Sequence, residues 1–188
     1  MVNYEFIDFN RGFENWKLVR LATLQDGSCL FHAIVSAYSI NYLKCSLQGN
    51  PITHEQIVLK LRKELAVKLP LHYNNLNNGA TNEFSKSVPE FTLDNMQKTL
   101  DSKEYIGYGY IEYIGNLLNK DIYILEDIGA DLYKFDNPKL IIKGNRPSIV
   151  LYYISEHYET VGILNENGSI DTHFSPNHSF IKFLRSGI

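Results

Sequence analysis

A succession of β-rich runs in the C-terminal part of the chain constrains the fold more than any other feature of the sequence. Each run is rich in β-branched and aromatic residues and is bounded by turn residues, which is typical of strands. The runs span residues 121–125, 131–135, 148–154, 157–164 and 169–174. Together they predict one mostly antiparallel sheet formed by the later part of the sequence.

Helical patterns dominate the part of the chain before these runs. The predicted helices are residues 29–40, a segment that begins at the Thr53–Gln56 capping box and ends near Leu69, a short segment from Thr92 to about Leu100, and residues 108–119. A last helix is predicted after Ser175, with Pro176 at its first position. The Asn-rich residues 74–83 predict a loop. Helices first and strands later indicate an α+β fold in which helices pack against one sheet.

The size and charge of the chain narrow the classes of function. A length of 188 residues suits one domain, so we expect a single domain over residues 1–188. The formal net charge of −3 gives no reason to expect nucleic acid or an anionic membrane as a partner. No apolar stretch approaches the roughly 20 residues that span a bilayer. Residues Met1 to Asn10 lack the basic region of a secretory signal.

The number and spacing of the cysteines bear on the cellular compartment, on disulfides and on metal binding. The chain has only Cys29 and Cys45, which are too few for a disulfide framework and do not form a CxxC pair. This usage favours a reducing, cytoplasmic compartment, where we expect the chain to be a monomer. Because no CxxC or HxxxH cluster occurs, we expect no metal and no other cofactor.

Cys29 lies where a turn meets a helix. The sequence Asp26-Gly27-Ser28 is typical of a turn, and the helical pattern begins at Cys29. The free N–H groups and the dipole of a helix N-terminus lower the pKa of a thiol. The backbone N–H groups of Asp26, Gly27 and Cys29 are candidate donors to an oxyanion. The alternative is that Cys29 packs as a small buried hydrophobe, which is our interpretation of Cys45.

A cysteine nucleophile needs a base, and His157 has the most suitable surroundings among the six histidines. His157 opens a predicted strand, and Glu159 projects to the same face two residues later. A carboxylate there can accept the imidazole Nδ1–H and leave the other nitrogen facing a thiol. A solvated His–Glu pair on a surface hairpin is the alternative. His173 with Asp171 is the second candidate for the base, and His32 is poorly directed because it shares one helix surface with the cysteine.

Taken together, these residues resemble the ovarian-tumour (OTU) family of cysteine proteases. That family carries an Asp-Gly-x-Cys-Leu-Phe stretch at the start of a central helix, matched here by Asp26 to Phe31. Much later it has an apolar strand that runs into His-Tyr, matched by "IVLYYISEHYETVG" at residues 149–162. A weaker match is "GYGYIEYIGNLLNKDIYIL" at residues 107–125, with Glu112 in the Glu position. The order of the cysteine and the histidine is also that of the family.

The resemblance implies a papain-like cysteine protease fold and a deubiquitinase, with ubiquitin or polyubiquitin chains, and ubiquitin-like modifiers besides, as partners. It implies that Cys29 is the nucleophile and His157 the general base. The third member of the triad in this family is commonly Asp or Asn two residues after the His, whereas this chain has Glu159, which is one methylene longer. Asp26 and Glu156 compete with Glu159 for that role.

Two other interpretations of the same residues stay open. One is a non-catalytic OTU-like module that only binds ubiquitin, although such a module would be expected to lack the Cys or the His. The other is a papain-like activity on a different substrate. The compact size is similar to that of viral OTU domains. This likeness implies a viral protein that acts in the host cytoplasm on the immune response.

Overall fold

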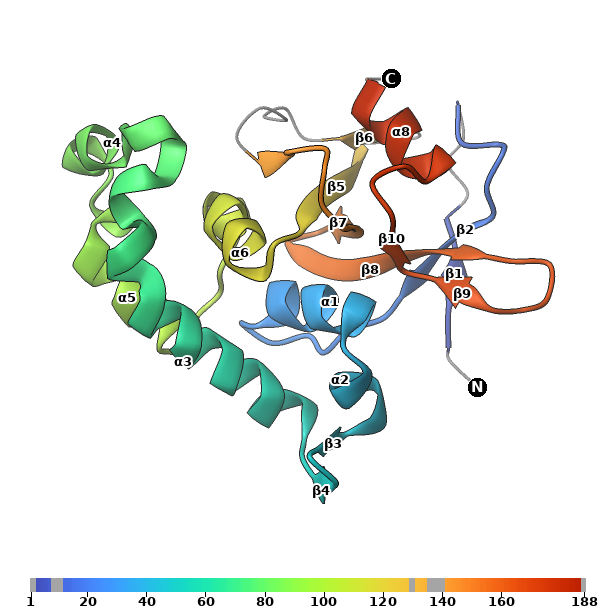
Figure 1. The fold of residues 1–188 in the computed structure, drawn as a ribbon, viewed down its shortest axis with the longest axis horizontal. Coiled ribbons are helices and arrows are strands. Elements are labelled where there is room, and N and C mark those ends of the chain that lie inside the picture. Colours follow the sequence, from blue (N-terminus) through green and yellow to red (C-terminus); the bar gives the residue numbers. More distant parts are fainter. Residues whose placement is uncertain (1–2, 8–11, 129–130, 135–140, 187–188) are drawn as a thin grey trace.

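A single twisted sheet organises the molecule (Figure 1). The computed structural model describes residues 3–7, 12–128, 131–134 and 141–186. The strands follow the order β1-β2-β8-β7-β5-β6. Their bounds are β1 Glu5–Phe6, β2 Leu18–Leu21, β5 Asp121–Ile128, β6 Asp131–Lys134, β7 Ser148–Ile154 and β8 His157–Leu164. Short strands β9 (Ile170–Asp171) and β10 (His173–Phe174) pair with β8 and β7. Only β5 and β7 pair in parallel, so the predicted, mostly antiparallel sheet is confirmed for the described strands.

Helices cover the sheet and extend away from it as an arm. The helices are α1 Cys29–Tyr38, α2 Ile40–Lys44, α3 His54–His72, α4 Thr81–Ser87, α5 Leu93–Leu100, α6 Ile111–Leu118 and α8 Ser179–Ser186. Within the described ranges, three 3₁₀-helices join them, η1 Tyr73–Gly79, η2 Pro89–Phe91 and η3 Tyr108–Tyr110. A separate small hairpin is formed by β3 Ser46–Leu47 and β4 Asn50–Pro51. Figure 1 shows the long α3 leading to α4 and α5, which lie far from β1 and β9.

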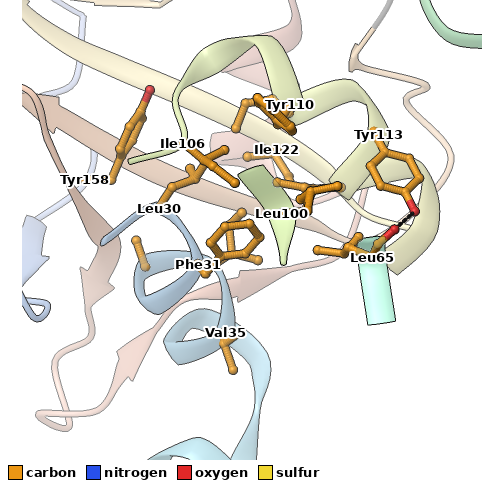
Figure 2. Packing of buried hydrophobic residues seen from close by; sticks show 14 of the residues in the cluster. Leu30, Phe31, Val35, Leu65, Leu100, Ile106, Tyr110, Tyr113, Ile122 and Tyr158 are labelled. Atoms are coloured by element: carbon orange, nitrogen blue, oxygen red, sulfur yellow. Dashed lines mark hydrogen bonds between the residues drawn. The ribbon is translucent and has the colours of Figure 1, made fainter. Parts of the chain in front are cut away.

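Two hydrophobic cores lie on opposite faces of the sheet. The larger one joins α1, α3, α5 and α6 to the sheet and contains Leu30, Phe31 and Leu100. In Figure 2 these side chains surround one another, and the Tyr113 hydroxyl donates to the Leu65 carbonyl at 2.6 Å. The smaller core packs α8 against the other face. Because strand side chains alternate, β8 serves both cores. Helix α1 packs against β8, where the Thr160 hydroxyl donates to the Ala33 carbonyl at 2.8 Å.

Several predicted helices are confirmed together with their caps. The Thr53 hydroxyl accepts the Gln56 N–H and the Gln56 side chain accepts the Thr53 N–H, so the capping box begins α3 as predicted. Thr92 likewise caps α5. The helix predicted over 29–40 starts at Cys29 but ends at Tyr38. It ends there because Ser39 has extended backbone angles and its hydroxyl caps α2 instead.

The loop predicted over residues 74–83 is wrong in part, because η1 and the start of α4 occupy it. Burial of Leu76 and a hydrogen bond from the Thr81 hydroxyl to the Leu76 carbonyl, at 2.6 Å, order this segment. Asn77 and Asn78 have positive φ angles within this segment. Tertiary packing therefore outweighs a loop-like composition here.

Two predicted elements near the C-terminus, the last helix and the last strand, differ from those in the structure. Pro176 is not the first residue of α8, because residues 175–178 form a turn closed by the His178 N–H and the Ser175 carbonyl, and the helix begins at Ser179. The strand predicted over 169–174 divides into β9 and β10. Phe135, the end of the predicted strand 131–135, lies outside the described residues. Among the described helices, none combines the length and the apolar character needed to cross a membrane.

Candidate active site

Cys29 is the first residue of α1, and a tight turn places it there. The Asp26 carboxylate accepts the Ser28 N–H at 2.8 Å, and the Cys29 N–H donates to the Asp26 carbonyl at 3.2 Å. The Cys29 N–H is thus engaged within the turn. The N–H groups of Asp26 and Gly27 have no acceptor among the residues that the structure describes. Of the three predicted oxyanion donors, these two are the more available.

A buried arginine fixes the turn from behind. Arg62 of α3 is only 1% exposed, and its guanidinium lies 5.0 Å from the Phe31 ring. Arg62 donates to the Ser28 hydroxyl at 2.8 Å. Its other acceptors are the carbonyls of Gly27, Thr99, Leu100 and Glu104. Gly27 has no room for a side chain, because a Cβ would lie 2.1 Å from the Lys103 carbonyl. The turn is therefore tied to the end of α5 and the segment after it.

His157 opens β8 after a two-residue turn. Ser155 and Glu156 both have positive φ angles, 48° and 62°, as a type I′ hairpin turn requires. Glu159 lies on the same face of β8 as His157, and its Oε1 is 3.9 Å from the imidazole. The nitrogen nearest to the carboxylate is Nε2, so the expectation that Glu159 would face Nδ1 is wrong.

Two residues of the site were missed by sequence reasoning, Thr23 and Arg20. The Thr23 Oγ1 lies 3.3 Å from His157 Nε2, and its hydroxyl donates to the Tyr158 carbonyl at 2.6 Å. The Arg20 guanidinium lies 3.3 Å from Glu159 Oε2 and also pairs with Glu5. Arg20 lies in β2, which pairs with β8, and Thr23 lies in the segment that follows β2. No local pattern marks them, because only strand pairing brings them to the histidine.

One groove of about 710 Å³ brings the candidate residues together. Its lining comprises Glu5, Arg20, Ala22, Gln25, Asp26, Cys29, Ile154, Ser155, Glu156, His157 and Glu159. The predicted nucleophile, base and all three candidates for the third position thus border the same space. No group of three or more His, Cys, Asp or Glu side chains is placed to hold a metal ion in the described part of the chain.

The other candidates lie elsewhere or are otherwise engaged. His32 is buried within α1, where its Nε2 donates to Asp26 at 3.3 Å and its Nδ1 lies 2.8 Å from the Tyr42 hydroxyl. His173, the second candidate for the base, lies 3.0 Å from Lys120 Nζ and does not line the groove. His32 therefore braces the turn, while His173 stands apart from the cysteine.

Cys45 and Glu112, which the sequence also singled out, both lie outside the groove. Cys45 is exposed, 3.1 Å from His54 Nε2, so its interpretation as a buried hydrophobe is wrong. The chain leaves α2 there in a left-handed conformation that turns Cys45 toward solvent. Glu112 lies outside the groove and accepts the Asn77 N–H through both carboxylate oxygens.

Burial raises the pKa of the Cys29 thiol above its ordinary value. Backbone N–H groups near Tyr158 and Leu30 act in the opposite direction, and the Asp26 carboxylate raises the pKa further. The lowering expected at a helix N-terminus is therefore present but smaller than the effect of burial, since Cys29 is only 2% exposed.

Solved structures with this fold are OTU domains. An ovarian-tumour domain in complex with ubiquitin has a TM-score of 0.60 at 19% identity, covering 99% of this chain and 89% of that one. The Hazara virus OTU bound to ubiquitin has 0.56 at 12%, covering 87% and 96%. The viral OTU protease of Dera Ghazi Khan virus has 0.52 at 15%, covering 87% and 96%. Neither protein-family models nor curated proteins match the sequence. The chain therefore has the papain-like fold of OTU domains, as the sequence motifs predicted.

Proposed function

We propose that the chain is a deubiquitinating cysteine protease, an isopeptidase that hydrolyses ubiquitin conjugates. The observation that carries this proposal is the single groove bordered by Cys29 at the start of α1 and His157 at the start of β8. Two solved examples of the fold are complexes with ubiquitin. Ubiquitin or its chains are the proposed partners, with ubiquitin-like modifiers as further candidates.

The proposed reaction proceeds through an acyl-enzyme. His157 takes the proton of the Cys29 thiol as the sulfur attacks the carbonyl carbon of the C-terminal glycine of ubiquitin. The resulting oxyanion is stabilised by the backbone N–H groups of Asp26 and Gly27, which have no acceptor among the described residues and are therefore available. When the C–N bond breaks, His157 gives its proton to the departing lysine amine. It then removes a proton from water, which hydrolyses the thioester and restores the thiol.

The remaining parts of the proposal concern Glu159, Asp26 and the setting of the enzyme. Glu159 contributes negative charge near the imidazolium, and Asp26 shapes the turn through its bond to the Ser28 N–H. The proposed catalytic unit is one domain over residues 1–188 that works in the cytoplasm, in the host cytoplasm if the chain is viral, without a metal or other cofactor.

The proposal is tested with a fluorogenic amide at the C-terminus of ubiquitin. We expect the parent chain to release the fluorophore, Cys29→Ala to be inactive, and Cys45→Ala to remain active as the matched control. A ubiquitin probe with an electrophile at its C-terminus should form an adduct at Cys29. Binding of ubiquitin without turnover or adduct would indicate a non-catalytic module. Turnover of other peptides alone would indicate a different papain-like activity.

A further inference from the structure

The hydroxyl of Thr23 contacts both the His157 imidazole and the carbonyl of Tyr158, the next residue of β8. We infer that Thr23 is a positioning residue that accepts the Nε2 proton of His157 and so leaves Nδ1 as the basic nitrogen. The inference deepens the proposed function and rests on it for its catalytic consequence. The tautomer itself is a property of the protein that does not depend on turnover.

The direction of the Thr23 hydrogen bonds follows from counting protons. A threonine hydroxyl has one proton and two acceptor lone pairs. At 2.6 Å from the Tyr158 carbonyl, which only accepts, Thr23 must use its proton there. Toward His157 Nε2, at 3.3 Å, the Thr23 oxygen can therefore act only as an acceptor. The bond exists when Nε2 carries a proton, so the neutral imidazole has its lone pair on Nδ1.

Glu159 does not provide this hydrogen bond in the structure. Its Oε1 is 3.9 Å from Nε2, beyond hydrogen-bonding distance, and its Oε2 faces Arg20 at 3.3 Å. Arg20 also pairs with Glu5, so the carboxylate of Glu159 is held on the side of β2. Orientation of the ring and compensation of its charge are thus divided between Thr23 and Glu159.

The consequence concerns the nitrogen that remains. Among the described residues, none donates to or accepts from Nδ1 of His157, and the ring borders the groove that Cys29 also lines. With Nε2 protonated, Nδ1 is the atom that receives the Cys29 proton when the sulfur attacks. A tautomer with Nδ1 already protonated has no lone pair there and would be unable to act as this base.

The test compares Thr23→Val, which removes the acceptor at nearly constant volume, with Thr23→Ser, which retains the hydroxyl. Nitrogen-15 NMR of the histidine side chains in the full chain reports the tautomer, and His157→Gln identifies the His157 signals. At a pH where the imidazole is neutral, we expect the Nε2–H tautomer in the parent and in Thr23→Ser. In Thr23→Val we expect a mixture of tautomers. Thermal unfolding of each variant checks that the fold is kept.

Kinetics with the fluorogenic ubiquitin substrate form the second part of the test. We expect Thr23→Val to lower kcat about 10- to 100-fold with little change in KM, in the range for losing one positioned polar contact. Thr23→Ser should stay within about threefold of the parent. An Nδ1–H tautomer in the parent, or an unchanged tautomer in Thr23→Val, would overturn the inference whatever the rates. An inactive parent with the expected tautomers would count against the proposed function alone.

Discussion

Cys29 lies at the N-terminus of a helix, which favours a thiolate, but its side chain is buried, which favours a thiol. It stands at the start of α1, yet burial and the Asp26 carboxylate both raise the pKa of its thiol. The sequence could place the cysteine at a helix start, but it could not show how deeply the side chain would be covered. The proposed mechanism therefore depends on proton transfer to His157 during attack and not on a thiolate formed beforehand.

The pH dependence of alkylation tests this protonation state. In a Cys45→Ala background, the rate of Cys29 alkylation by iodoacetamide should rise with pH to a midpoint above that of an ordinary thiol. Because the negative charge of Asp26 disfavours the thiolate, Asp26→Asn should move the midpoint to lower pH. Asn can still accept the Ser28 N–H, and His157 and Glu159 are the same in both proteins. A midpoint that stays or rises in Asp26→Asn would contradict the role given to this charge.

Glu159 is expected to matter much less than His157. At 3.9 Å from Nε2 and paired with Arg20, it contributes charge without a hydrogen bond. Glu159→Ala should lower kcat about 10-fold, whereas His157→Ala should lower it by orders of magnitude. Fluorogenic turnover measures both, with Asp171→Ala, which lies outside the groove, as the control. Equal losses of kcat in Glu159→Ala and His157→Ala would indicate that Glu159 is a hydrogen-bonding partner of His157.

At the scale of elements, Arg62 connects α3 to the turn before Cys29. Its guanidinium is buried and donates to the Ser28 hydroxyl and to backbone carbonyls at the end of α5. Arg62→Met should lower the free energy of unfolding by about 3 kcal/mol, because these buried acceptors lose their donor. Lys63→Met, an exposed neighbour on the same helix, should change it by no more than about 0.5 kcal/mol. Denaturant unfolding measures both, and similar small changes would show that the Arg62 bonds add little.

The β7–β8 hairpin allows a stabilising change to be predicted. Ser155 and Glu156 occupy left-handed conformations, which cost an ordinary residue about 1–2 kcal/mol. Asn-Gly is the preferred pair for such a turn. The double substitution Ser155→Asn, Glu156→Gly should therefore stabilise the fold by about 1 kcal/mol, seen as a higher Tm. The reversed pair Gly-Asn is the control, and a Tm no higher than the parent would argue against strain in this turn.

The elements that the sequence predicts well are those whose signals are local. The capping box of α3 and the β-rich runs of β7 and β8 depend on neighbours along the chain, and these elements are confirmed. Strands β1 and β2 were not predicted, because they are short and β2, with which β1 pairs, is itself held by β8, far away in sequence. The same distance in sequence hides Thr23 and Arg20 from pattern reasoning. Cys29 and His157 could thus be predicted from local motifs, whereas Thr23 and Arg20 could not, because strand pairing brings them to the candidate site.

For the molecule as a whole, the position of the groove suggests how a partner would be held. The groove lies at the N-terminal end of β8, where β2, the β7–β8 hairpin and the start of α1 meet. A segment entering it would contact elements from both the N-terminal and the C-terminal parts of the chain. Binding should therefore stabilise the whole fold cooperatively, since it favours the native state over the unfolded chain.

Cys29→Ala is the form in which this linkage can be measured, because it should bind ubiquitin without consuming a conjugate. Ala is a good helix former and keeps the start of α1 intact. At a free ubiquitin concentration 100 times Kd, the free energy of unfolding should rise by about 2.7 kcal/mol, measured as an increase in Tm with ubiquitin concentration. Ubiquitin that lacks its C-terminal glycines is the matched control and should give a smaller increase, because the groove beside residue 29 would stay empty. Equal increases with both forms would place the contact outside the groove, and no increase with either would argue against ubiquitin as the partner.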